Sequence, residues 1–320
     1  MRDRTLLIGL MYAGSLILTS AAICRGTMQT ANGEPYTLTM TVNEVSLNFH
    51  ASDLRGKPIQ DLSSNKLQVS DNGRLQERIL SLQLYQNLPI RAGFLFDRSE
   101  SMAEELDRNA SIANLYASLL LRRGQDRAFV AGFDTHVKIT RDWTDDPKAI
   151  SSGIDSLRET QKIDDLGAGT AIFDSLYLVC RDRWNAGHDI VSGNFILLFT
   201  DGIDNASHAR IDDVIDICQR TRTAIYIFTN QWNTRGSSQG SKTLHELATK
   251  SGGRLFLNPD DNQVAKDVQM IDEDRRNQYQ LIYRPSDLKP DGSFHRIRIH
   301  SSKRGTTILV RSGYYAPGRP

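Results

Sequence analysis

The amino-acid sequence predicts an α/β protein with a doubly wound, mostly parallel sheet flanked by helices. Within residues 88–262, apolar segments of strand length alternate with segments whose apolar residues recur at helical spacing. The strand segments 90–96 and 194–200 are continuously apolar, as expected where helices cover both faces of a sheet. Alternating strands and helices favour parallel pairing. We therefore expect one α/β domain over residues 88–262.

The segments on either side of this domain read as β-structure. Residues 36–87 alternate between apolar and polar side chains, and Asp71-Asn72-Gly73 is a strong hairpin signal because Asn and Gly tolerate positive φ. A charged helix is expected over 263–276, followed by β-strands within 277–317. We expect the two β-rich segments to pair and form a β-sandwich into which the α/β domain is inserted. The alternative is two independent β extensions.

The N-terminus resembles a secretory signal peptide over residues 1–26. Arg2 and Arg4 precede a mostly apolar run over 6–23, and small residues suitable for cleavage follow near its end. We expect export to the periplasm or secretion from the cell. The run is also long enough for an uncleaved membrane anchor. Beyond this segment the sequence contains no second hydrophobic span.

Composition argues against nucleic-acid binding. The 39 Lys and Arg residues nearly balance the 38 Asp and Glu residues, and no basic block stands out. The sequence also lacks a His-Glu-x-x-His pairing, a Gly-x-Ser-x-Gly elbow and a P-loop lysine motif. We therefore expect a protein that is not an enzyme.

Two cysteines remain after the predicted cleavage. Cys180 and Cys218 each recur with apolar residues at helical spacing, so both are expected on buried helix faces. Free thiols that act as small apolar side chains are the favoured interpretation. A disulfide is the alternative, because an exported protein permits it and the sequence does not give the distance between the two residues.

Oxygen-bearing side chains follow the first predicted strand of the α/β domain. Asp97, Ser99 and Ser101 alternate directly after segment 90–96, where a loop can turn three oxygens toward one point. Such a cluster suits a small divalent cation such as Mg²⁺. The simpler interpretation is a helix start at which Ser99 or Ser101 is an ordinary N-cap.

Two further segments favour the metal interpretation. Thr170 ends Gly-Ala-Gly-Thr before a predicted helix, and Asp201 follows the second apolar strand, 194–200, within Thr-Asp-Gly. Ligands of parallel sheets bind at the carboxyl ends of the strands. Because Asp97 and Asp201 both occupy such ends, we expect one shared site.

The three segments in this order resemble the von Willebrand factor type A (vWA) domain and its metal-ion-dependent adhesion site (MIDAS). The likeness covers about residues 88–258 and implies a Rossmann-like fold. The ending 311–317 and the segments 54–59 and 69–73 also resemble an exported bacterial subgroup, the VWFA-related Acidobacterial domain. The resemblance implies that one cation, Mg²⁺ or Mn²⁺, is bound by Asp97, Ser99, Ser101, Thr170 and Asp201.

The resemblance further implies cation-dependent recognition of a protein partner that supplies an Asp or Glu carboxylate to the ion. Glu100 stands where the family usually has Gly; Glu100 and Asp204 are expected near the ion outside its direct coordination, and the sequence leaves open whether Glu100 blocks the open metal position. Glu100 could strengthen cation binding or compete with the acidic ligand. The alternatives are a structural component of a cell-envelope assembly with a purely structural metal, and a Mg²⁺-dependent hydrolase.

Overall fold

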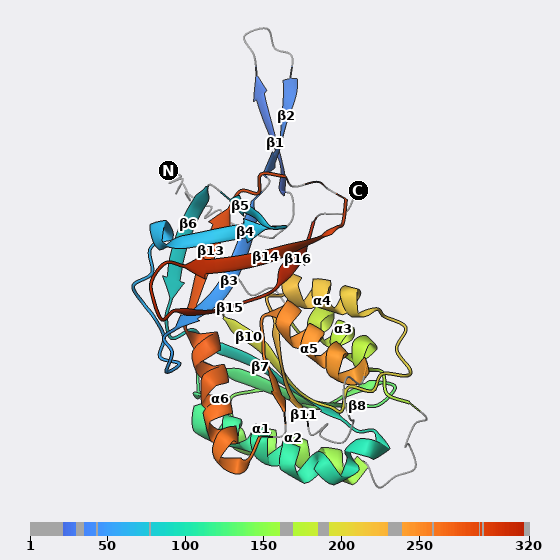
Figure 1. Ribbon diagram of the computed structural model, residues 1–320. Coiled ribbons are helices and arrows are strands. Elements are labelled where there is room, and N and C mark those ends of the chain that lie inside the picture. The colour runs from blue at the N-terminus through green and yellow to red at the C-terminus, as the bar shows by residue number, and fades with distance from the viewer. Residues whose placement is uncertain are drawn as a thin grey trace, which may run out of the picture.

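The computed structural model describes residues 22–29, 35–42, 44–76, 78–160, 169–184, 192–229, 239–257, 259–287, 289 and 291–316. An α/β domain and a β-sandwich lie end to end, and a hairpin projects beyond the sandwich (Figure 1). The hairpin pairs β1 (Ala22–Gln29) with β2 (Pro35–Val42). Residues 1–21 of the predicted signal peptide lie outside the described residues.

The α/β domain is built on a six-stranded sheet of order β12-β11-β10-β7-β8-β9. Every neighbouring pair is parallel except β8 with β9, which is antiparallel. The predicted fold class is therefore confirmed. The strands are β7 (Ile90–Asp97), β8 (Arg127–Phe133), β9 (Val137–Thr144), β10 (Gly193–Phe199), β11 (Ala224–Thr229) and β12 (Leu255–Leu257).

Helices cover both faces of this sheet, which explains why its central strands are apolar throughout. One face packs against α1 (Leu106–Leu120), α2 (Pro147–Thr160) and α6 (Asp261–Arg276). The other packs against α3 (Ile172–Arg183), α4 (Ile211–Arg220) and α5 (Gln239–Ser251). The predicted charged helix 263–276 is thus α6, and it packs on the sheet of the α/β domain.

The β-sandwich joins segments from both sides of the α/β domain. Strand β3 (Val45–Ser52) lies between β13 (Gln278–Tyr283) and β15 (Thr307–Val310), and β6 (Ile79–Tyr85) completes that sheet. The N-terminal and C-terminal β segments therefore pair directly across the inserted domain. The second sheet has the order β16-β14-β4-β5, with β4 (Leu67–Asp71), β5 (Arg74–Gln76), β14 (Phe294–Ser301) and β16 (Gly313–Tyr315).

The turn between β4 and β5 is the hairpin turn that the sequence predicted. Asn72 and Gly73 have φ angles of 49° and 80°, the left-handed conformation that a two-residue hairpin turn requires. Asp71, just before this turn, is buried and accepts hydrogen bonds from the hydroxyls of Tyr283 and Tyr314 at 2.7 and 2.8 Å. The bond from Tyr283 on β13 connects the two sheets inside the sandwich, and Tyr314 lies in the same sheet as Asp71. Among the described residues, no helix has both the length and the apolar character needed to cross a membrane.

The structure contradicts the prediction that Cys180 and Cys218 are free thiols. Cys180 on α3 and Cys218 on α4 form a disulfide, with Cα atoms 5.1 Å apart. Both side chains are buried, as expected. The two helices pack side by side, and that packing, which the periodicity of each helix does not reveal, brings the sulfur atoms together.

Removing this disulfide should weaken the α/β domain. Replacing both residues in Cys180→Ala/Cys218→Ala releases a crosslink between positions 38 residues apart, and we expect a loss of about 3 kcal/mol in unfolding free energy. Urea unfolding of the oxidised wild type and the double variant would measure it. Equal midpoints would show that the crosslink does not restrict the unfolded chain.

A buried ionic cluster joins α6 to the start of the sheet. The guanidinium of Arg276 donates two hydrogen bonds to the Asp126 carboxylate, at 2.8 and 3.1 Å, and another to the backbone oxygen of Leu88. Asp126 also accepts a bond from the backbone N–H of Ile90 at 2.8 Å. Burial opposes the charge of Asp126, but the bonds from Arg276 and Arg122 outweigh it and lower the pKa of the carboxyl group.

Asp126→Asn should cost about 2 kcal/mol at neutral pH, because it removes one of the two carboxylates that pair with the buried guanidinium of Arg276 and leaves only Asp272. A carboxyl group whose pKa is lowered in the folded state contributes stability above its unfolded value and loses it as pH falls. The difference between wild type and variant should therefore shrink below the ordinary value of 3.8. Urea unfolding of both proteins at a series of pH values would measure this difference in unfolding free energy. A difference independent of pH would contradict a stabilising role for the ionised Asp126 carboxylate.

Candidate metal centre

Strand pairing brings the first and third predicted segments together. In the parallel ladder of β7 and β10, Phe96 is opposite Phe199. Asp97 is the next residue on one strand, and Thr200 and Asp201 continue the other. The rings of Phe96 and Phe199 stack at 4.7 Å beneath this edge. A rigid, buried platform thus supports the candidate site at the carboxyl end of the sheet.

Asp97 is held in a buried position. Its exposed fraction is 3%, and its two carboxylate oxygens accept bonds from the Thr200 hydroxyl at 2.6 Å and the backbone N–H of Ser99 at 2.9 Å. Burial, helped by the nearby charge of Asp201, outweighs the lowering effect of these bonds and raises the pKa of Asp97 to about 6. A cation beside this carboxylate would favour its charged form and offset the cost of burial.

Ser99, Ser101 and Asp201 form a chain of oxygens beside Asp97. The Ser101 hydroxyl donates to Asp201 Oδ2 at 2.7 Å, and the hydroxyl oxygens of Ser99 and Ser101 are 3.1 Å apart. Ser99 precedes the short 3-10 helix Glu100–Glu105, yet its side chain makes no capping bond. The structure therefore does not support the simpler N-cap interpretation of Ser99, and the hydroxyl of Ser101 points to Asp201.

Thr170 is positioned by the loop that follows Asp201. Its backbone N–H donates to Asn205 Oδ1 at 2.7 Å, and its carbonyl accepts from the N–H groups of Asn205 and Ala206 at 3.0 and 3.2 Å. A Cβ at Gly169 would come within 2.9 Å of Ala206, so this close approach requires glycine. The second predicted segment is thus docked against the third.

Asp204 and Glu100 have different surroundings. Asp204 accepts bonds from the backbone N–H of Phe173 at 3.0 Å and from the Ser207 hydroxyl at 2.7 Å. It satisfies the first turn of α3, whose N-cap residue Ala171 makes no side-chain capping bond. Glu100 is the first residue of the 3-10 helix, and it is exposed.

Two residues that sequence reasoning did not single out hold the site together. Thr200 is fully buried and fixes Asp97, and Asn205 fixes Thr170. Thr200 stands next to Asp201 in the Thr-Asp-Gly segment, so its position was a usable signal. The contact of Asn205 depends on the path of a loop, and no spacing in the sequence indicates it.

The residues present fit a hard divalent cation. The predicted ligands provide two carboxylates and three hydroxyls, the oxygen donors that Mg²⁺ and Mn²⁺ prefer, with no sulfur or imidazole among them. In the described part of the chain, no group of three or more His, Cys, Asp or Glu side chains gathers as a metal site, and the candidate centre itself has two carboxylates beside its hydroxyls. The buried, desolvated Asp97 gives a physical reason for a cation here.

Comparison with known proteins agrees with the fold. The von Willebrand factor type A domain matches residues 93–270. Among curated proteins, no match was found. The exported bacterial subgroup stays a prediction.

Several solved structures have a similar fold. BatB from Bacteroides thetaiotaomicron is 16% identical with a TM-score of 0.45, over 57% of this chain and 97% of that one. A von Willebrand factor type A protein from Catenulispora acidiphila is 12% identical with a TM-score of 0.44, over 80% and 75%. Proximal thread matrix protein 1 from the mussel byssus, described with a zinc-occupied MIDAS motif, is 15% identical with a TM-score of 0.43, over 59% and 48%.

Calorimetric titration of Mg²⁺ and Mn²⁺ into chelator-treated protein should give binding heat in the wild type. Asp201→Asn keeps the shape of the side chain but removes a charge next to Ser101, so we expect affinity to fall by about tenfold or more. Asp287→Asn, an exposed position on the sandwich, is the matched control and should bind as the wild type does. Equal binding by both variants would place the cation elsewhere.

Proposed function

Because the chain belongs to the von Willebrand factor type A domain family, we propose that it is an exported bacterial protein that recognises a protein partner through a divalent cation. Domains of this family commonly mediate metal-dependent protein interactions and are typically not enzymes. The cation would be Mg²⁺ or Mn²⁺, bound by Asp97, Ser99, Ser101, Thr170 and Asp201. The partner would contribute an Asp or Glu carboxylate.

The position of Asp97, Ser99, Ser101 and Asp201 together at the carboxyl end of the sheet is the observation that supports the proposal. Ser99 and Ser101 lie side by side, Ser101 bonds to Asp201, and the Asp201 loop positions Thr170. A bound ion supplies Lewis-acid attraction for a carboxylate. The neutral hydroxyls leave much of the ion's charge uncompensated, which favours an acidic ligand.

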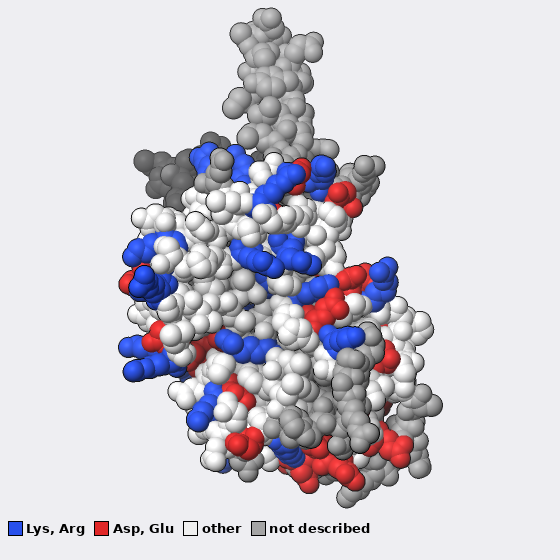
Figure 2. Space-filling view, in the orientation of Figure 1, with Lys and Arg blue, Asp and Glu red and all other residues white. Residues whose placement is uncertain are grey.

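The surface around the site would make recognition depend on the ion. Glu100 and Glu104 are exposed beside it, and acidic side chains gather at the end of the molecule away from the sandwich (Figure 2). Negative side chains would repel a carboxylate in the absence of the cation. Ile203, 52% exposed and two residues after Asp201, offers apolar area next to the ion for contact with the partner.

Two features support export. The basic start and apolar run at the N-terminus are typical of a secretory signal. The Cys180–Cys218 disulfide suits an oxidising compartment, since disulfides are rare in reducing cytoplasm. The proposed location is therefore the periplasm or the extracellular space.

A peptide array offers a direct test of carboxylate recognition. Peptides that contain Asp or Glu, each paired with its Asn or Gln counterpart, would be probed with the wild type in Mg²⁺, in Mn²⁺ and in chelator. We expect binding that requires both the cation and the carboxylate. Thr170→Ala should weaken it by about tenfold or more, because it removes one hydroxyl from the proposed coordination sphere.

Thr307→Ala, at an exposed position on β15, is the matched control and should bind peptides as the wild type does. Thermal unfolding of both variants would check that Thr170→Ala stays folded. Peptide binding that persists in chelator, or that does not distinguish Asp from Asn, would overturn the proposal. Unfolding in chelator with no acidic peptide bound would favour a structural metal instead.

A further inference from the structure

Basic side chains lie in a row on the outer face of the second sheet of the sandwich. Along β14, His295 and Ile297 are buried, whereas Arg296, Arg298 and His300 are exposed. Successive side chains of a strand point to opposite faces of its sheet. One face of β14 therefore packs into the sandwich core, and the other turns two arginines and a histidine toward solvent.

The positive charge of this row is not neutralised within the sheet. Arg298 is opposite Ser70 of β4, which is opposite Leu75 of β5. Arg296 is opposite Gly313 of β16. The side chains of Arg296 and Arg298 form no ion pair or hydrogen bond with any other described residue. Leu75 is 59% exposed, so an apolar side chain shares this face with the arginines.

The row continues into the loop that follows β14. The backbone N–H of Ser302 in this loop donates to the carbonyl of Lys66 at 2.9 Å. A Cβ at Gly305 would lie 3.9 Å from Leu54 Cγ, so the loop also lies beside the turn that follows β3. Lys66 and Arg304 are exposed, and Leu54 is 83% exposed. Two further basic side chains and one large apolar side chain thus extend the row.

The turn that carries Leu54 adds to both kinds of side chain. Arg55 and Lys57, which follow Leu54, are exposed. The carboxylate of Asp53 accepts bonds from the backbone N–H groups of Arg55 and Lys57 at 2.8 and 2.9 Å, so it is engaged inside the turn. A single exposed leucine is ordinary on a protein surface. Here, however, the leucine stands among basic side chains.

The sandwich as a whole is the basic part of the molecule. Taken together, the segments 36–87 and 277–317 contain more Lys and Arg than Asp and Glu, whereas residues 88–276 contain more Asp and Glu. Figure 2 shows Lys and Arg side chains gathered over the sandwich, where β14 crosses it in Figure 1, and acidic side chains at the opposite end. An anionic surface would therefore attract the sandwich and repel the other end.

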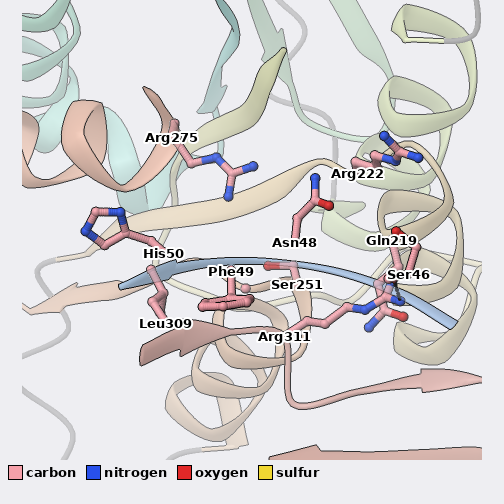
Figure 3. A pocket seen from close by; sticks show the side chains of 11 residues that line it. Ser46, Asn48, Phe49, His50, Gln219, Arg222, Ser251, Arg275, Leu309 and Arg311 are labelled. Carbon is pink, nitrogen blue, oxygen red and sulfur yellow. Dashed lines mark hydrogen bonds between the residues drawn. The ribbon is translucent and has the colours of Figure 1, made fainter. Parts of the chain in front are cut away.

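Two arginines near the sandwich do not belong to this surface. Figure 3 shows Arg275 and Arg311 lining a cavity between the sandwich and the α/β domain. Arg275 is 8% exposed, and Arg311 donates to the carbonyl of Ser46 at 3.1 Å. Both are enclosed by protein, whereas the arginines of β14 are free to contact a large partner.

From this arrangement we infer that the outer sheet face and the Leu54 turn bind the surface of an anionic phospholipid membrane. Each Lys or Arg near such a surface is attracted by the lipid headgroups. Leu54 would enter the headgroup region, where burial of its apolar side chain adds to the attraction. A soluble anionic polymer offers Leu54 no apolar region to enter, so the combination favours lipid.

The order of the chain agrees with a membrane partner. The apolar run 6–23 precedes the sandwich, so export or anchoring through that run brings the sandwich to a membrane. Contact through the sandwich would leave the acidic end, with the candidate metal centre, directed away from the lipid. The inference goes beyond the proposed partner recognition and does not depend on a metal being bound.

Cosedimentation with lipid vesicles would test this surface. The protein, purified as an exporting host processes it, is mixed with phosphatidylcholine vesicles that contain or lack phosphatidylglycerol. We expect binding that requires the anionic lipid and weakens as salt is added. Arg296→Gln/Arg298→Gln should lower the partition coefficient by about tenfold or more, because it removes both charges of the β14 row.

Arg123→Gln/Arg181→Gln is the matched control, because it removes the same charge from exposed positions of the α/β domain. It should bind vesicles as the wild type does, and circular dichroism would check that both double variants are folded. An equal loss of binding in the two double variants would overturn the inference. Retention on heparin without binding to anionic vesicles would overturn it too, since it would favour a soluble anionic polymer.

If the N-terminal run stays attached and holds the protein on both kinds of vesicle, a local probe decides. Leu54→Trp should lose more fluorescence than the wild type when anionic vesicles contain brominated phospholipid, because the added indole lies in the headgroup region. Leu119→Trp, at a position 66% exposed on α1, is the control and should behave as the wild type does. No added quenching at position 54 would overturn the inference.

Discussion

The parallel pairing of β7 with β10 is the constraint on which the candidate metal centre depends. The register that sets Phe96 opposite Phe199 leaves Asp97 and Thr200 as neighbours at the edge of the sheet. A shift by one residue would turn these side chains to opposite faces. The ring stack from Phe96 through Phe199 to Phe228 resists such a shift, because it fills the core beneath the site.

A second constraint is the closure of the β-sandwich around the inserted domain. Strand β3 bonds to β13 and β15, which come from the far side of the α/β domain. The parallel strands therefore begin next to the sandwich, and their carboxyl ends point away from it (Figure 1). This arrangement separates the molecule into an exposed acidic end with the candidate metal centre and a junction rich in arginine.

The strongest local signals in the sequence predicted what the structure shows. Continuous apolar strands, helical spacing and Asn72-Gly73 each reflect short-range physics, so the α/β class and the β4–β5 turn followed from them. The order of Asp97, Thr170 and Asp201 along the chain was enough to predict one site, because the carboxyl ends of parallel strands share an edge. The contacts by which Asp204 and Ser207 satisfy the first turn of α3 were not predicted, because they depend on the path of the loop after Asp201.

By itself, then, the sequence determined the family and the fold class, and it predicted the residues of the candidate metal centre. Only the tertiary structure decided which helices lie side by side, and that packing joins Cys180 to Cys218. The tertiary structure also decided which arginines pair with a carboxylate. Arg276 pairs with Asp126, whereas Arg311 lines a cavity whose described lining residues include no Asp or Glu. These contacts connect residues far apart in the chain, so their energies depend on packing that no local pattern encodes.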